Sequence, residues 1–134
     1  MRRRNFLKSA TAAAVVGVIL PTSNASASQD SKKEVIAHYV LFWLREDITE
    51  QEKADFTNFF EELRKVPNIK SLHYGGPANT TQRDVVDNSF TYNLLVYFDK
   101  MEHLDVYETH PIHLDAIEKY SKYWTKVAVH DSIL

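Results

Sequence analysis

A tyrosine and two histidines lie close together in the seven-residue stretch YETHPIH, residues 107–113. A neutral imidazole can take a proton from a substrate, and a phenol can donate a hydrogen bond to a developing oxyanion. The i, i+3 spacing of His110 and His113 could instead place two imidazoles on one metal ion, but no third ligand is evident nearby in the sequence. The stretch could also only begin a helix, with Pro111 at its first position and His110 as its cap. The surrounding elements decide between these interpretations.

The elements that must position these residues are predicted in the order β-α-β-β-α-β, which is the ferredoxin-like arrangement of an α+β fold. Right-handed crossovers then place the helical units on one face of a four-stranded antiparallel sheet, with the first and last strands adjacent. The four strands are expected where β-branched and aromatic residues are concentrated, at residues 34–44, 69–74, 90–98 and 126–134.

Helix caps and apolar spacing predict the helices. The first should open at the capping box of Thr49 and Glu52 and end at Pro67. Its apolar stripe is Phe56, Phe59, Phe60 and Leu63. A short second helix, capped by Asp99, should carry on one side Met101, Leu104 and Tyr107. The final helix should begin at Pro111, and its buried stripe is His113, Ile117, Tyr120 and Trp124.

The first strand is apolar on both of its faces, which does not fit an isolated sheet with helices on one side only. Together with the third strand it would leave a large apolar patch in water: Tyr39, Leu41, Trp43, Leu95 and Tyr97. Patches of this kind usually mark an interface. A homodimer in which two sheets face each other is therefore predicted, with an isolated monomer as the alternative.

Polar residues interrupt the apolar faces at positions that should converge. His38 shares a strand face with Val40 and Phe42, and Asp131 shares one with Val129. Because the first and last strands run antiparallel, His38 and Asp131 could be near neighbours.

Tyr107 and His113 should point into the same space between helices and sheet, and convergent polar groups in an apolar cavity are typical of a ligand site. In the alternative reading each group is a satisfied core residue. The Tyr107 hydroxyl would then bond a carbonyl, and Asp131 would only hold His38 in one tautomer.

The amino-terminal segment has the features of an export signal. Residues 1–27 combine a basic start, which resembles a twin-arginine signal, with an apolar run and a small-residue cleavage pattern ending at Ala27. Residues 28–34 read as a polar tether. The protein is therefore expected to be periplasmic or otherwise exported, with a retained membrane anchor as the alternative.

Charge and composition exclude several classes of partner. Removing residues 1–27 takes four of 16 basic residues and none of the 18 acidic ones, which leaves 12 against 18 and a net charge of −6. Nucleic acid and anionic membrane surfaces both require a basic face, so neither is expected as a partner. The chain has no cysteine, which excludes thiol chemistry and disulfides.

Three segments resemble the stress-responsive α/β-barrel (Dabb) family: AHYVLFWLREDITEQEK, HPIH and YWTKVAVHD. The resemblance covers about residues 35 to 131 and places the domain at 35–134. It implies a ferredoxin-like dimer whose two sheets form a barrel, a dimeric α+β barrel.

Similarity to a plant polyketide cyclase of this family implies site residues. Tyr107 and His113 match its catalytic pair, with His113 as the base and Tyr107 as the donor to an enolate or carbonyl oxygen. Phe60 stands where that enzyme has a pocket tyrosine, and Glu61 where it has a small apolar pocket residue. The full set of expected ligand-binding residues is His38, Val40, Phe42, Phe60, His110, Trp124, Val129 and Asp131.

Two functions are consistent with these features, and neither requires a cofactor or a metal. The first is an exported homodimer whose apolar pocket binds a small carbonyl-bearing or aromatic ligand. The second is a cofactor-independent enzyme, such as a polyketide-cyclase-like lyase, an isomerase or a monooxygenase, that uses His113 and Tyr107.

Overall fold

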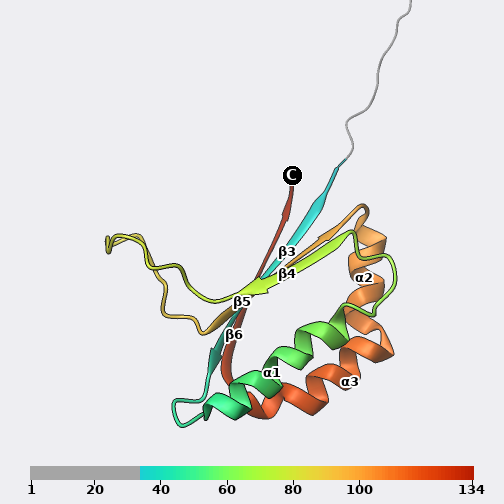
Figure 1. Cartoon of the computed structure of the whole chain (residues 1–134). Helices are drawn as coiled ribbons and strands as arrows, with labels where there is room; N and C mark the ends of the chain where they lie inside the picture. The colour runs from blue at the N-terminus through green and yellow to red at the C-terminus, as the bar shows by residue number, and fades with distance from the viewer. Residues whose placement is uncertain (1–33) are drawn as a thin grey trace, which may run out of the picture. The chain divides into compact units, whose positions relative to one another are not determined.

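A computed structural model describes residues 34–134 (Figure 1). The predicted signal peptide and residues 28–33 of the predicted tether lie outside this range, so export stays a prediction. The elements follow the chain as β3 (Ile36–Leu44), α1 (Glu50–Leu63), β4 (Ser71–Gly75), β5 (Tyr92–Phe98), α2 (Met101–Thr109), α3 (Pro111–Tyr120), a 3₁₀ turn (Ser121–Tyr123) and β6 (Trp124–Ile133). None of the helices within residues 34–134 is long and apolar enough to span a membrane.

The four strands form one antiparallel sheet in the order β4-β5-β3-β6, and the helices cover one of its faces (Figure 1). This is the predicted ferredoxin-like arrangement, with the first and last strands adjacent. The register of β3 and β6 pairs His38 with Asp131, and that of β3 and β5 pairs His38 with Val96. The fold prediction is confirmed.

Helix α1 begins for a reason that is visible in the sequence, and it ends at Leu63, before the predicted stop at Pro67. The Thr49 hydroxyl accepts from the Glu52 backbone N–H at 3.0 Å, and the Glu52 carboxylate accepts from the Thr49 N–H at 3.0 Å, so the predicted capping box is present. Arg45 adds a bond to the same Glu52 carboxylate at 3.3 Å. The predicted stripe is buried as a unit: Phe56, Phe59, Phe60 and Leu63.

Aromatic side chains fill the layer between helices and sheet. The ring centroid of Phe42 on β3 lies 5.6 Å from that of Phe56, 5.7 Å from that of Phe59 and 5.3 Å from that of Trp124. Edge-to-face and tilted contacts of this kind add roughly 0.5–1.5 kcal/mol each beyond the burial of apolar area. Three members of this cluster, Phe42, Phe59 and Trp124, line the cavity described below.

The predicted cap of α2 is wrong. The helix has Lys100 at its cap position with no side-chain cap bond. Asp99 lies one residue earlier, and its carboxylate pairs with Lys70 at 3.2 Å. Met101 is then the first residue of the helix and is 45% exposed, whereas Leu104 and Tyr107 are buried as expected.

Trp124 was expected in the last helix but is the first residue of β6. Helix α3 ends at Tyr120, and the 3₁₀ turn after it is held against β3 by hydrogen bonds from the Arg45 backbone N–H to the Tyr123 carbonyl and from the Arg45 side chain to the Lys122 carbonyl. These bonds let the strand start two residues before the predicted residue 126, where Trp124 pairs with Leu44.

The sheet face turned away from the helices is the predicted dimer surface. Its large side chains are all only partly buried in a single chain: Tyr39, Leu41, Trp43, Leu95 and Tyr97. No helix of residues 34–134 covers this face (Figure 1). A second copy would bury these side chains, and each Å² of apolar area removed from water would stabilise the dimer by roughly 25 cal/mol.

We predict that Leu95→Glu shifts the protein from dimer to monomer, because a carboxylate in the middle of the sheet face would be buried without a partner. Light scattering coupled to size-exclusion chromatography measures the mass, and far-UV circular dichroism checks that the fold is kept. Val106→Glu, at a position 46% exposed on α2, is the matched control and should remain dimeric. A Leu95→Glu protein that stays dimeric, or a monomeric wild type, would contradict the prediction.

Candidate functional site

A cavity of about 160 Å³ lies between the sheet and the helices. Strands β3, β5 and β6 and all three helices contribute to its wall: His38, Val40, Phe42, Phe59, Leu63, Leu94, Tyr107, Glu108, His113, Ile117, Trp124, Val127 and Val129. Most of these side chains are apolar or aromatic, and the few polar ones converge on the same space. This combination is typical of a small-molecule site.

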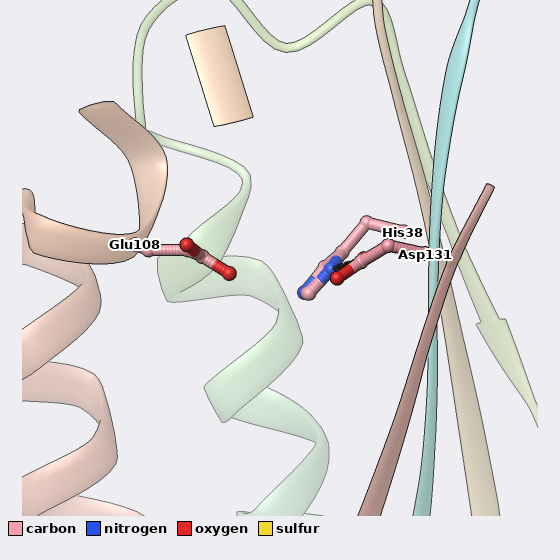
Figure 2. Close-up of side chains that lie close together, drawn as sticks. All are labelled: His38, Glu108 and Asp131. Carbon is pink, nitrogen blue, oxygen red and sulfur yellow. Dashed lines mark hydrogen bonds and ion pairs between the residues drawn. The ribbon is translucent and has the colours of Figure 1, made fainter. Parts of the chain in front are cut away.

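His38 is fixed by Asp131 across the β3–β6 pair. Its Nδ1 lies 2.6 Å from Oδ1 of Asp131, and the His38 side chain is 7% exposed while the Asp131 side chain is 43% exposed. A carboxylate can only accept, so Nδ1 carries the proton and donates it. The ring is therefore held in one orientation, with its second nitrogen available to the cavity. Figure 2 shows the two side chains reaching from adjacent strands toward Glu108.

Tyr107 is the most unusual group of the cavity wall. Its side chain is fully buried at 0% exposure, and its hydroxyl has no hydrogen-bond partner among residues 34–134. Its ring is packed between those of Phe98, His38 and His113, at centroid distances of 5.2, 5.6 and 4.6 Å. Burial raises the pKa of the phenol well above its usual range, and the nearby Glu108 charge adds to this effect. Tyr107 is thus a neutral donor without an acceptor in the part of the chain that the structure describes.

His113 stands in the first turn of α3 and is half-buried. Its Nδ1 lies 3.1 Å from the backbone carbonyl of Glu108, which can only accept, so Nδ1 carries the proton and Nε2 keeps a lone pair. Burial lowers the pKa of the imidazole. The bond to the Glu108 carbonyl acts in the opposite direction, and the neighbouring His38 lowers the pKa further. His113 is therefore a neutral imidazole near pH 7, with the protonation that a general base requires.

Most of the expected site residues lie where the sequence placed them. Five of the expected ligand-binding residues, and both expected catalytic residues, line the cavity: His38, Val40, Phe42, Trp124 and Val129, with Tyr107 and His113. Asp131 joins them through its bond to His38. These positions fit the predicted roles, and binding itself stays a prediction.

Phe60 and His110 do not line the cavity. Phe60 is fully buried and stacks on Tyr74 at a centroid distance of 4.4 Å, while Phe59 faces the cavity because successive helical residues point about 100° apart. His110 accepts a hydrogen bond from the Ile112 N–H through its Nδ1 at 3.1 Å, so it caps α3. The predicted cap is confirmed, and the predicted contact of His110 with a ligand stays a prediction, although His110 is not among the residues that line the cavity.

Glu61 also lies outside the cavity, contrary to the position implied by the family resemblance. It is exposed, accepts a hydrogen bond from the Tyr74 hydroxyl at 2.8 Å and pairs with Arg64 at 3.1 Å. The helix turns this side chain to the outer surface, away from the cavity wall.

Glu108 is the functional candidate that the sequence reasoning missed. It lines the cavity beside Tyr107, and its carbonyl fixes the tautomer of His113. Its place in YETHPIH, between two predicted catalytic residues, was the available signal.

The group that could hold a metal ion is not the pair in the HPIH segment. Within residues 34–134, the clustered ligand atoms belong to His38, Glu108 and Asp131 and lie within 4.8 Å of one another (Figure 2). The nitrogen and carboxylate donors of this group suit a divalent cation. One of its contacts is already satisfied by the bond between His38 and Asp131.

Comparison with known proteins agrees with the fold. A family model described as Stress responsive A/B Barrel Domain (Dabb) matches residues 36–134. Olivetolic acid cyclase from Cannabis sativa is 25% identical over 97 residues, which cover 72% of this chain and 93% of that protein.

Solved structures extend the comparison. A dimeric protein of unknown function and ferredoxin-like fold from Bacteroides fragilis is 26% identical, with a TM-score of 0.59 and coverage of 75% of this chain and 96% of that one. Hydroxynitrile lyase from Passiflora edulis has a TM-score of 0.66 at 16% identity and covers 77% of this chain and 95% of its own.

We predict that Tyr107→Phe raises the free energy of unfolding of the ligand-free protein by about 1 kcal/mol, because a buried hydroxyl without a partner costs roughly 1–3 kcal/mol. Urea denaturation at a fixed protein concentration measures the change. Tyr123→Phe is the matched control. It removes a hydroxyl that donates to Asp55 at 2.6 Å and should lower stability. If Tyr107→Phe destabilises the protein as Tyr123→Phe does, the hydroxyl has a partner within the fold.

Proposed function

The chain belongs to the stress-responsive A/B barrel domain (Dabb) family, and from this premise we propose that it is an exported homodimer whose cavity binds a small carbonyl-bearing or aromatic compound. The character of residues 1–27 supports export, and the dimeric relatives of the same fold support the assembly. The cavity of each protomer is the binding site in this proposal.

The observation that carries the proposal is Tyr107, which lines an apolar cavity and whose buried hydroxyl has no hydrogen-bond partner among residues 34–134. A neutral phenol donates readily to a carbonyl oxygen, and such a bond would remove the unfavourable burial of the hydroxyl. An exposed hydroxyl would be satisfied by water and would point to no ligand. Here the Tyr107 hydroxyl is fully buried and has no partner among residues 34–134, so a ligand that fits the proposal must offer it an acceptor.

The volume of the cavity limits the size of the ligand. At about 160 Å³ it is close to an engineered cavity of roughly 150 Å³ that binds benzene. One aromatic ring with a short substituent therefore matches the available space, and a long extended chain does not. The rings of Phe42, Phe59 and Trp124 offer the apolar and aromatic contacts that such a ring needs.

We predict that acetophenone, a single ring with one carbonyl group, binds in this cavity. The chain has two tryptophans, so a ¹H–¹⁵N spectrum contains two indole signals. The Trp124 signal should shift on titration because Trp124 lines the cavity. The Trp43 indole donates to Ser89 at 3.0 Å, outside the cavity wall, and its signal is the internal control. An unmoved Trp124 signal, or equal shifts of both signals, would argue against the proposed site.

A second candidate function is cofactor-independent catalysis, and the pairing of His113 with Tyr107 favours it. The two rings lie 4.6 Å apart by centroid, with a neutral base on one and a neutral donor on the other. In the proposed step, Nε2 of His113 takes a proton from the carbon next to a ligand carbonyl. The electron pair of the broken C–H bond moves into an enolate, whose oxygen accepts the Tyr107 hydrogen bond. The similarity to olivetolic acid cyclase supports this class of reaction.

We predict that the protein catalyses exchange of the methyl protons of acetophenone for deuterium in D₂O, followed by NMR. His113→Ala should slow the exchange by roughly 100-fold or more, the usual contribution of a general base. The base acts when neutral, and the pKa of His113 lies below its usual 6.5. The rate should therefore stay high below pH 6.5 and fall only as the pH drops through the lowered pKa.

His73→Ala, at an exposed histidine of β4 outside the cavity wall, is the matched control and should exchange like wild type. Exchange that persists in His113→Ala would remove His113 as the base. Binding of acetophenone without any exchange would exclude the catalytic candidate and leave the binding function.

A further inference from the structure

We propose that Glu108 and Asp131 make the cavity selective against anions, so that its ligand is an uncharged or cationic compound. The inference rests on the proposed function, because it names the chemical class accepted by that same site. It concerns a carboxylate, Glu108, that has no place in the proton transfer described above.

The two carboxylates approach the cavity from opposite sides. Glu108 lines it from the end of α2, and Asp131 on β6 is bonded to His38, which lines the cavity from β3 (Figure 2). Ligand-type atoms of the three side chains lie within 4.8 Å of one another, so a molecule that meets one of these groups also meets the field of the others.

The charge balance of the site is negative whichever state His38 adopts. No lysine or arginine of residues 34–134 lines the cavity, and Glu108 takes part in none of the ion pairs of that range. A protonated His38 would offset Asp131 alone, and a neutral His38 would offset neither carboxylate. Burial keeps Tyr107 and His113 uncharged near pH 7, so they add no compensating charge.

An anionic ligand would therefore face two unfavourable effects. It would lose hydration in a mostly apolar cavity without a fixed cation to pair with, and it would be repelled by the Glu108 charge a few ångströms away. Repulsion between charges at such a distance in partly hydrated surroundings corresponds to roughly a tenfold loss of affinity. Neutral ketones, aldehydes and amides avoid both effects, and an ammonium or amidinium group would gain from the same field.

Three compounds of one planar shape and different charge test the inference: benzamide (neutral), benzoate (anionic) and benzamidine (cationic). Affinities at pH 7 are measured from the Trp124 indole signal, in EDTA so that no divalent cation neutralises the carboxylates. We expect benzoate to bind at least about tenfold more weakly than benzamide, and benzamidine to bind at least as well as benzamide. Added salt should narrow these differences, because Glu108 is exposed.

Glu108→Gln keeps the shape of the side chain and removes its charge, so the benzamide-to-benzoate ratio should fall several-fold. Asp105→Asn removes an exposed carboxylate from the same helix outside the cavity wall and should leave the ratio unchanged. Equal binding of benzoate and benzamide, or a ratio in Glu108→Gln that matches Asp105→Asn, would overturn the charge selectivity while the ligand site stands. If neither benzamide nor acetophenone moves the Trp124 signal, the proposed function itself fails.

Discussion

The hydrogen bond between His38 and Asp131 is the interaction on which the site depends. A buried imidazole on the inner face of a sheet costs roughly 1–3 kcal/mol unless it has a partner. The register of β3 and β6 supplies that partner, because it sets His38 directly opposite Asp131. Since β6 is the edge strand, Asp131 stays partly in water while His38 is buried. One strand pairing thus allows a polar group in an apolar wall and fixes its orientation.

The opposite arrangement holds for Tyr107, which lies fully buried with no partner for its hydroxyl in the described part of the chain. Its ring belongs to the aromatic packing of the core, so the fold needs the ring and not the hydroxyl. A group kept at a cost to stability is expected where function requires it. The contrast between a satisfied histidine and a tyrosine without a partner in the described chain is what the proposed ligand site would explain.

The sequence could predict features that depend on period and order. Alternation along the strands and the βαββαβ order predicted the topology. The topology in turn predicted that His38 and Asp131 are neighbours, although most of the folded chain separates them in sequence. The cap formed by His110 was also readable, because Pro111 favours the first position of a helix.

Other features could not be predicted from the sequence pattern. They depend on a helix rotation of a single residue or on a tertiary contact that competes with a local one. Phe59 and Phe60 are both buried, and only the packed helix decides that Phe59 faces the cavity. Asp99 is a residue type that often caps helices, but it pairs instead with Lys70, just before β4. Trp124 fits the helical spacing of His113, Ile117 and Tyr120, but Arg45 holds the turn before it against β3, so Trp124 begins a strand. In each case a tertiary contact overrides a local pattern.

The central claim is that the unpartnered Tyr107 hydroxyl marks the place of a ligand acceptor. A crystal structure of the protein with acetophenone tests it most directly. The account predicts the ligand carbonyl oxygen within hydrogen-bond distance of the Tyr107 hydroxyl, its ring against Trp124, and the bond between His38 and Asp131 unchanged. A structure in which the Tyr107 hydroxyl bonds a protein atom, with acetophenone bound elsewhere or absent from the cavity, would contradict it.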